Sequence, residues 1–550
     1  MKITLAQLNY HVGNFIRNKE LITLAINKAK DQGSDLVIFS ELSVVGYPPL
    51  DLLDRLDFIE KSDKVIKQIA GECYGIAALV GAPVRNRRPE GKKLFNSALL
   101  LSEGEIIFSA NKALLPTYDI FDEYRYFEPE KQFSVFEYKG VRMAVTICED
   151  LWDEQPFDNE FERSRLYTVS PMEELAAQNP DIIINISASP FSYSRVESRK
   201  DIFRSKARKY NKPVIVVNQI GANTELIFDG ASAVFSNTGE IVHQLPSFEE
   251  AVFTFQMSDL FSGTASDNHS GADVISLIHK ALITGIKDYF GKMGFRDSIL
   301  GLSGGLDSAV TLCLAAEALG KDHVRALLLP SRYSSEHSVT DSVCLAERLG
   351  VKYDIVSIEK AFSAFEEILA PYFTGRETDV TEENVQARVR AIILMAFANK
   401  FNYILLNTSN KSEAAVGYGT LYGDMAGGLS VIGDVYKTDV YLLAEYINRN
   451  GEIIPRSIIT KPPSAELRPG QFDTDSLPDY GLLDSILHQY IELQRSPARI
   501  EVNTPDSTIV ERVLNMINSN EYKRYQAPPV LRISSKAFGA GRRMPLVARF

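Results

Sequence analysis

Hydrophobic and polar positions follow two different periods along the first 255 residues. Short apolar runs predict β-strands, whereas residues 18–33 and 171–179 space their apolar side chains as a helix does. The predicted strands lie at residues 2–8, 35–40, 77–84, 96–102, 142–148, 181–187, 212–218 and 231–236. Because strands outnumber helices, a plain doubly wound sheet is disfavoured. The pattern predicts an α/β domain of two sheets with helices outside, an α-β-β-α arrangement.

The second half repeats strand and helix in strict order. A helix is predicted over residues 276–294, and four strands alternate with helices after it. These strands lie at residues 298–303, 324–330, 353–358 and 402–408. This order is typical of a doubly wound, Rossmann-like parallel sheet. Residues 464–481 are polar and rich in turn formers, which predicts a mobile lid.

Between the halves, residues 259–274 are rich in Ser, Gly, Asp and Asn and predict a linker. We therefore expect domains at residues 1–258 and 275–550. A chain of 550 residues is too long for a single core, which agrees with two domains.

Composition and charge narrow the class of protein. A hydrophobic fraction of 45% with 24% charged residues is typical of a globular domain, and the net charge of -12 argues against binding to nucleic acid. No apolar run has the length of a membrane span, and the N-terminus does not resemble a signal peptide. None of the four cysteines forms a C-x-x-C pair, so we expect a reducing, cytoplasmic location. These cysteines are Cys73, Cys148, Cys313 and Cys344.

The sequence SGGLDS, residues 303–308, joins a predicted strand to a predicted helix. Its glycines permit close backbone approach, and the helix that follows directs N–H groups at the loop. Ser303 and Ser308 add hydroxyl donors, so the loop suits a phosphate. The lysine of a Walker loop is missing, and Asp307 would repel a phosphate unless Mg²⁺ lay between them. The alternative is a glycine-rich turn with helix-capping residues.

SGGLDS resembles the loop of the ATP-pyrophosphatase family, which cleaves ATP to AMP and pyrophosphate. The segments TEENVQARVRAIILM, LNTSNKSEAAVGYGTLYGDMAGGLSVIGDVYKTDVY and KPPSAELRPGQFDTDSLPDY resemble NAD synthetases in particular. The resemblance implies that Asp307 and Glu413 hold Mg²⁺, with Asn384, Glu413 and Lys536 toward deamido-NAD. It implies ATP contacts for Gly301, Leu302, Ser303, Gly304, Gly305, Leu306, Asp307, Ser308, Thr408 and Lys437, with Ser464 as a further phosphate contact.

Two arginines near Asn384 remain open to two interpretations. Arg388 and Arg390 either meet phosphates or are solvated charges on the helix surface.

Three reactive residues of the first half follow predicted strands. Cys148 ends one strand, while Glu41 and Lys112 follow two others. Such strand ends can meet at one edge of a sheet, where a thiol is more reactive than inside a strand. The alternative for Cys148 is a core cysteine, which is our interpretation of the other three.

This arrangement resembles the Glu-Lys-Cys triad of the nitrilase, or carbon–nitrogen hydrolase, superfamily. The resemblance covers about the first 255 residues and includes the segments NQIG and FDGAS. It implies that Cys148 is the nucleophile, Glu41 the base and Lys112 the oxyanion stabiliser, with Glu123 supporting the lysine. It also implies a glutamine site at Tyr118, Ser189 and Arg195.

Together the two resemblances indicate the family of glutamine-dependent NAD synthetases. They imply a ligase that adenylates deamido-NAD with ATP and amidates it with ammonia from glutamine or from solution. They also imply a homo-oligomer built on a dimer of the second domain. We expect an enclosed ammonia tunnel and coupled sites, since free ammonia is mostly protonated at neutral pH.

Two other hypotheses remain at this stage. The same chemistry is compatible with another acid as acceptor, as in GMP or asparagine synthetases. A nucleotide-sensing module that regulates a carbon–nitrogen hydrolase is a hypothesis of another class, and it predicts a broken loop or a missing metal carboxylate. Asp307 and Glu413 are both present, which counts against it.

Overall fold

The computed structural model describes residues 1–154, 165–261, 273–502 and 508–548. The chain divides into two compact units, Met1–Gly271 and Ala272–Phe550. Of the expected linker, residues 262–272 lie outside the described residues, while η5 (Met257–Phe261) is a short 3-10 helix and α5 begins at Val274.

Two six-stranded sheets form the first unit. In strand order, the first sheet contains β14 (Ala251–Gln256), β1 (Lys2–Gln7), β2 (Leu36–Ile38), β3 (Ala77–Arg85), β4 (Leu94–Ser102) and β5 (Glu105–Asn111). The second contains β13 (Ile241–Gln244), β12 (Ala233–Phe235), β9 (Val214–Asn218), β8 (Ile182–Ser187), β7 (Val141–Ile147) and β6 (Phe136–Tyr138). A hairpin of β10 (Ile220–Asn223) and β11 (Leu226–Asp229) is separate.

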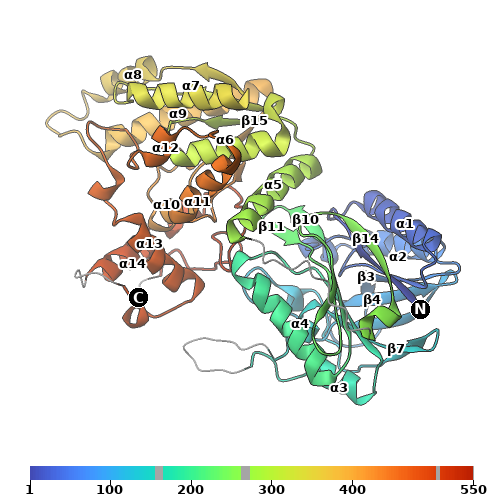
Figure 1. Cartoon of the computed structure of the whole chain (residues 1–550). Helices are drawn as coiled ribbons and strands as arrows, with labels where there is room; N and C mark the ends of the chain where they lie inside the picture. The colour runs from blue at the N-terminus through green and yellow to red at the C-terminus, as the bar shows by residue number, and fades with distance from the viewer. Residues whose placement is uncertain (155–164, 262–272, 503–507, 549–550) are drawn as a thin grey trace. The chain divides into compact units, whose positions relative to one another are not determined.

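Apolar side chains of the two sheets meet in a common core, which includes Leu5, Leu79, Val145 and Ile184. Helices cover the outer faces: α1 (Phe15–Asp31) and α2 (Leu56–Ala70) pack on the first sheet, and α3 (Pro171–Ala177) and α4 (Val196–Tyr210) on the second. Figure 1 shows these helix pairs on opposite sides of the strands. The α-β-β-α arrangement predicted from the sequence is confirmed.

The second unit is built on a five-stranded parallel sheet. Its strand order is β17 (Lys352–Ile355), β16 (Val324–Leu328), β15 (Ser298–Gly301), β18 (Ile404–Asn407) and β19 (Leu429–Ser430). The order reverses direction between β15 and β18, which is the switch point where doubly wound folds bind ligands. The predicted doubly wound sheet is therefore confirmed.

Helices lie on both faces of this sheet. α9 (Val380–Phe401) packs on one face with α8 (Glu359–Leu369) beside it. The other layer contains α5 (Val274–Met293), α6 (Leu306–Leu319), α7 (Glu336–Leu349) and α11 (Lys437–Ile447). The remaining helices are α10 (Lys411–Val416), α12 (Arg456–Thr460), α13 (Tyr480–Leu487), α14 (Ile509–Ser519) and α15 (Glu521–Arg524). α13 and α14 pack against α10 in a separate apolar cluster (Figure 1).

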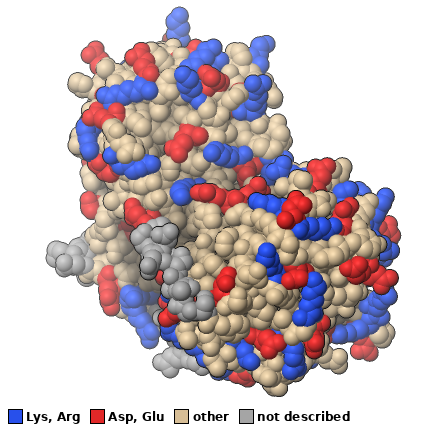
Figure 2. Space-filling model, turned by 45° about the vertical axis from the view of Figure 1, so that its right-hand side comes forward, with Lys and Arg blue, Asp and Glu red and all other residues tan. Residues whose placement is uncertain are grey.

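Charge is mixed over the surface. Lys and Arg side chains are interspersed with Asp and Glu on the face drawn in Figure 2. Within the described ranges, none of the helices is both long and apolar enough to cross a membrane.

Candidate active sites

Cys148 follows β7 directly and begins the short 3-10 helix η3 (Cys148–Leu151). Its φ of +45° lies in the left-handed region, which costs a residue with a Cβ free energy and is typical of functional turns. The Asn185 side chain donates to the carbonyl of Cys148 at 3.2 Å and holds this turn. Cys148 thus lies on a constrained turn at the end of β7, and its side chain is buried at the edge of the core between the two sheets.

Lys112 lies between two carboxylates in the interior of the first unit. Its Nζ donates to Glu41 Oε1 at 2.8 Å and to both oxygens of Glu123 at 2.8 and 2.9 Å. All three side chains are buried. Burial alone would lower the pKa of Lys112, but the charges of Glu123 and Glu41 raise it well above its usual value. The lysine therefore remains a cation.

The Cys148 thiol belongs to the same electrostatic cluster. Burial raises its pKa well above the usual value, the charge of Glu41 raises it further, and Lys112 opposes the shift. Burial also raises the pKa of Glu123 to about 7, with Lys112 opposing. The structure thus brings Glu41, Lys112, Glu123 and Cys148 together, and we call this group the Cys148 site.

Several polar partners of this site were not identified from the sequence. Asn96 Nδ2 and the Ala188 N–H donate to the two oxygens of Glu41 at 2.7 and 3.0 Å. Asp150 Oδ1 accepts from the N–H groups of Ala113 and Leu114 at 3.0 and 2.9 Å. Asp150 therefore ties the segment after Lys112 to the turn of Cys148, and its position two residues after the cysteine was the available sequence clue.

Glu149 is a buried carboxylate beside residues that are expected to bind the substrate glutamine. The hydroxyls of Tyr118 and Tyr167 both donate to its Oε1, at 2.8 and 2.9 Å, and burial raises its pKa. Arg195 is exposed at the end of η4 (Tyr193–Arg195), and its charge acts on both Tyr118 and Glu149. Ser189 follows β8, and its N–H donates to Asn218 Oδ1 at 2.9 Å. Tyr118 and Arg195 thus lie near Glu149. Glu149 itself was not predicted from the sequence as a site residue.

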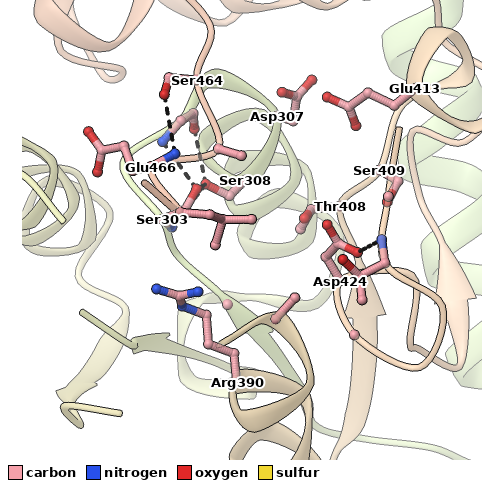
Figure 3. A pocket seen from close by; sticks show the side chains of 18 of the residues that line it. Ser303, Asp307, Ser308, Arg390, Thr408, Ser409, Glu413, Asp424, Ser464 and Glu466 are labelled. Atoms are coloured by element: carbon pink, nitrogen blue, oxygen red, sulfur yellow. Dashed lines mark hydrogen bonds between the residues drawn. The ribbon is translucent and has the colours of Figure 1, made fainter. Parts of the chain in front are cut away.

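A cavity of about 610 Å³ opens at the carboxyl ends of β15, β16 and β18, and we call it the C-terminal cavity. Figure 3 shows its labelled side chains converging from several elements. Of the expected residues, it is lined by Gly301, Leu302, Ser303, Gly305, Leu306, Asp307, Ser308, Asn384, Thr408, Glu413, Lys437 and Ser464. Residues from β15, α6, α9, α10 and α11, and from the segments after β18 and α12, therefore line one cavity at the switch point.

The SGGLDS loop has the close packing that its glycines predict. Gly304 has a φ of +79°, and a Cβ there would lie 2.5 Å from the Ser338 carbonyl oxygen on α7. Ser303 Oγ accepts from the Gly305 N–H at 3.2 Å and lies 3.1 Å from Ser308 Oγ. Gly305 precedes α6 directly, so the first N–H groups of that helix point to the loop. The loop thus offers backbone N–H groups of the kind that bind anions.

Asp307 of this loop lies close to a second carboxylate, Glu413, and to Lys437. Lys437 forms an ion pair with Asp307, and its Nζ is 4.0 Å from Glu413 Oε1. Asn410 Nδ2 donates to the other oxygen of Asp307 at 3.0 Å. Burial and the nearby charge of Asp307 raise the pKa of Glu413 well above its usual value. Adding a cation between the two carboxylates would relieve this repulsion.

Four of the expected residues have further contacts or positions that bear on their roles: Asn384, Lys536, Arg388 and Arg390. Thr420 donates to Asn384 Oδ1 at 2.7 Å, which connects α9 to the segment at residues 417–428. Lys536 does not line the C-terminal cavity in the described chain; its carbonyl accepts from Lys411 Nζ at 3.0 Å. Arg388 is exposed and donates to the Leu421 carbonyl, whereas Arg390 lines the cavity.

The segment expected to be a lid lies against the cavity. Ser464 to Arg468, Gln471, Asp473 and Ser476 line it, together with Lys461. Glu466 accepts from Lys461 Nζ at 2.6 Å and from Ser335 Oγ at 2.9 Å at the start of α7. Sequence reasoning did not assign Lys461 or Glu466, because a contact across about 130 residues leaves no local pattern.

Comparison with known proteins places both units. The model of the carbon-nitrogen hydrolase family matches residues 2–260, and that of the NAD synthase family matches residues 278–527. The fold and sites thus define a two-domain enzyme that joins a carbon–nitrogen hydrolase unit to an NAD synthase unit.

Full-length relatives narrow this class. The chain is 42% identical to a "Glutamine-dependent NAD(+) synthetase" of Synechocystis sp., covering 100% of this chain and 99% of the relative. It is 40% identical to the protein of that name from Acinetobacter baylyi, covering 99% and 98%. A solved glutamine-dependent NAD+ synthetase from Acinetobacter baumannii, in complex with ADP, is 37% identical with a TM-score of 0.78, covering 99% and 98%. The chain belongs to the glutamine-dependent NAD(+) synthetase family.

Proposed function

We propose that the chain converts deamido-NAD to NAD with ATP and glutamine. The nicotinate carboxylate attacks the α-phosphorus of ATP, which releases pyrophosphate and forms an acyl-adenylate. Ammonia then attacks the acyl carbon, and AMP leaves as the amide forms. Glutamine hydrolysis supplies the ammonia and leaves glutamate. The observation that supports the proposal is that one chain combines a thiol–lysine–carboxylate cluster with a cavity of about 610 Å³ beside a glycine-rich loop.

In the first unit, Cys148 attacks the side-chain amide of glutamine and forms a thioester. Because the thiol has a raised pKa, its proton must leave during the attack, and Glu41 is the base that receives it. Glu41 then passes the proton to the departing ammonia and activates water for thioester hydrolysis. Lys112 stabilises the oxyanion, and Glu123 holds the lysine in place from the other side.

Glutamine recognition would use the residues around Glu149. An anionic Glu149 would pair with the α-ammonium of glutamine, while Arg195 would pair with its α-carboxylate. Tyr118 keeps Glu149 oriented, and Ser189 would contact the bound amino acid from the end of β8.

In the second unit, the loop after β15 would hold the phosphates of ATP, and Thr408 and Ser464, which line the same cavity, would contact the nucleotide. The donor set of Asp307 and Glu413 fits Mg²⁺, which favours one or two carboxylates completed by phosphate oxygens and water. When bound, Mg²⁺ would neutralise charge on the departing pyrophosphate. Lys437 neutralises the same charge from its buried position, and its Asp307 contact would be shared with the metal. Asn384 and Glu413 would contact deamido-NAD from the cavity wall, whereas Lys536 would reach it only from outside the cavity lining.

The second unit also exposes apolar side chains that suit pairing of two copies. Phe365 and Ile368 on α8 and Ile392 and Met395 on α9 are each at least 40% exposed. We propose a homodimer through this face. Ile392→Asp should lower the mass measured by light scattering to that of one chain, and an unchanged mass would exclude this face.

The acceptor is the part of the proposal that most needs an experiment. With ATP and Mg²⁺ and with ammonium supplied, AMP and pyrophosphate release should depend on deamido-NAD. XMP and aspartate, the acids used by GMP and asparagine synthetases, should not replace it. Equal stimulation by either of these acids would overturn the choice of substrate.

A further inference from the structure

Arg390 lines the C-terminal cavity, and Figure 3 shows its guanidinium end directed into the open space. It lies on α9, where its Nε donates to the carbonyl oxygen of Leu329 at 3.0 Å. This bond fixes the plane of the guanidinium and leaves its two amino groups for another partner. The side chain is therefore pre-oriented at the cavity wall.

The charge of Arg390 is not matched by an ion pair in the described chain. Two carboxylates, Asp424 and Glu466, act on it at longer range. Asp424 accepts the Thr420 N–H at 2.6 Å, and Glu466 is held by Lys461 at 2.6 Å. Burial lowers the pKa of Arg390 to about 10, so it remains a cation at neutral pH. A partly buried, unpaired cation is costly unless an anionic ligand completes it.

The position of Arg390 within the cavity indicates which part of a nucleotide it meets. Four apolar residues line one part of the cavity: Ala391 and Leu394 on α9, and Leu327 and Leu328 at the end of β16. Together they form an apolar section that suits adenine. The phosphate loop and Asp307 form the polar section, where the pyrophosphate of ATP would lie. Arg390 comes from the same helix as two of the apolar residues, and Figure 3 shows its guanidinium end turned into the space below Ser303 of the phosphate loop. A phosphate between adenine and the pyrophosphate would therefore lie within its reach.

We infer that Arg390 binds the α-phosphate of ATP through its guanidinium fork, an inference that rests on the function proposed above. Two parallel N–H···O bonds suit a phosphate better than a lysine ammonium does. The α-phosphate is the group attacked in the first step and retained in AMP. Arg390 would therefore hold the same phosphate through both steps, whereas Lys437 and the metal carboxylates serve the pyrophosphate that leaves.

The test compares Arg390→Gln and Arg390→Lys with Lys400→Gln, which removes one exposed charge from the same helix. Equilibrium binding of Mg²⁺-ATP is measured, together with the KM for ATP and for deamido-NAD. Arg390→Gln should weaken ATP binding and raise its KM about 10- to 100-fold, the loss expected for a charged hydrogen bond. Arg390→Lys should fall between the wild type and the Gln variant. The KM for deamido-NAD should change less than about twofold.

Two controls separate this role from a structural one. Circular dichroism and the Tm report that the second unit of each variant is folded, and Lys400→Gln should bind ATP normally. Unchanged ATP binding in Arg390→Gln would overturn the inference, as would an effect confined to deamido-NAD. Equal losses for both substrates with a lowered Tm would also overturn it, because they indicate that only the Leu329 contact matters. Since ATP binding is measured without an acceptor, the result stands apart from the identity of the acceptor.

Discussion

The Cys148 site and the C-terminal cavity both place lysines next to carboxylates, but they differ in how many of their charged groups have partners within the protein. In the first, Lys112 is fully buried between Glu41 and Glu123, and each of these groups has a protein partner. In the second, Glu413 is destabilised by Asp307, and Arg390 has no ion pair within the described residues. We therefore expect that the first site carries its chemistry in protein side chains and that the second is completed by its ligands.

This difference predicts that the two sites respond differently to substitution. Losing a reactive group should disable the first site outright, while the second should lose binding in steps that ligand or metal concentration can partly restore.

The largest effect is expected for Cys148→Ala. Glutamine-dependent NAD synthesis should fall by about four orders of magnitude or more, because the nucleophile is lost. Synthesis from added ammonium should persist, since the C-terminal cavity is intact. The two rates are measured by NAD formation, with Cys344→Ala as the matched cysteine control. Loss of both rates in a folded variant would contradict the separation of the sites.

Asp307→Asn should reverse that pattern. Adenylation should fall about 100- to 1000-fold, because the carboxylate of Asp307, which would hold Mg²⁺ beside the phosphates, is removed. Basal glutamine hydrolysis should remain, and the Mg²⁺ concentration for half-maximal AMP formation should rise. Exposed Asp322→Asn on the same unit is the control. An unchanged Mg²⁺ dependence would remove Asp307 from metal binding.

The thiol of Cys148 should react slowly with iodoacetamide at neutral pH. Its pKa is raised by burial and by Glu41, so the thiolate fraction at pH 7 is small and grows as the pH rises. The alkylation rate, followed by peptide mass spectrometry, should increase about tenfold per pH unit from pH 6 to 9, as expected below a pKa. A plateau below pH 8 would show a preformed thiolate and would exclude Glu41 as the base during attack.

The smallest effect is expected for Glu466→Gln. The Glu466 carboxylate accepts hydrogen bonds from Lys461 and from Ser335 at the start of α7, and so holds the segment after Lys461 against that helix. Its backbone has a φ of +50°, in the left-handed region. Weakening this partly exposed contact should raise the KM for ATP about two- to fivefold, with little change in the rate at saturation. Glu336→Gln, an exposed carboxylate on α7, is the control. Equal KM values for the two variants would show that Glu466 does not hold the segment.

Strand-end residues were the part of the sites most open to sequence reasoning. Glu41, Lys112, Cys148 and Asp307 each follow a strand directly or by a short turn, which marked them as candidates. The expectation that Glu41, Lys112 and Cys148 meet at one edge of a single sheet was wrong, because Glu41 and Lys112 follow strands of the first sheet and Cys148 follows a strand of the second. They meet because the two sheets pack together. Asn96, which also contacts Glu41, lies within β4, where nothing separates it from an ordinary sheet residue. Its role depends on the pairing of β3 with β4 and becomes visible only in three dimensions.

The helices show a similar limit. α5 (Val274–Met293) was predicted at residues 276–294, because its apolar side chains recur at helical spacing. α4 was not among the predicted helices: of its 15 residues only Phe203, Lys206 and Ala207 are buried, so its apolar stripe is almost absent. Arg388 and Arg390 remained open for the same reason, since the direction of each side chain depends on how α9 packs on β15.

The central claim is that nitrogen from glutamine, released at Cys148, becomes the amide of NAD at the C-terminal cavity. Its most direct test supplies amide-¹⁵N glutamine, deamido-NAD, Mg²⁺ and ATP, and follows the label in NAD by mass spectrometry while AMP is counted. One ¹⁵N should appear in the nicotinamide for each AMP formed, with little dilution by unlabelled ammonium. NAD that carries no ¹⁵N, or ATP turnover that yields ADP in place of AMP, would contradict the account.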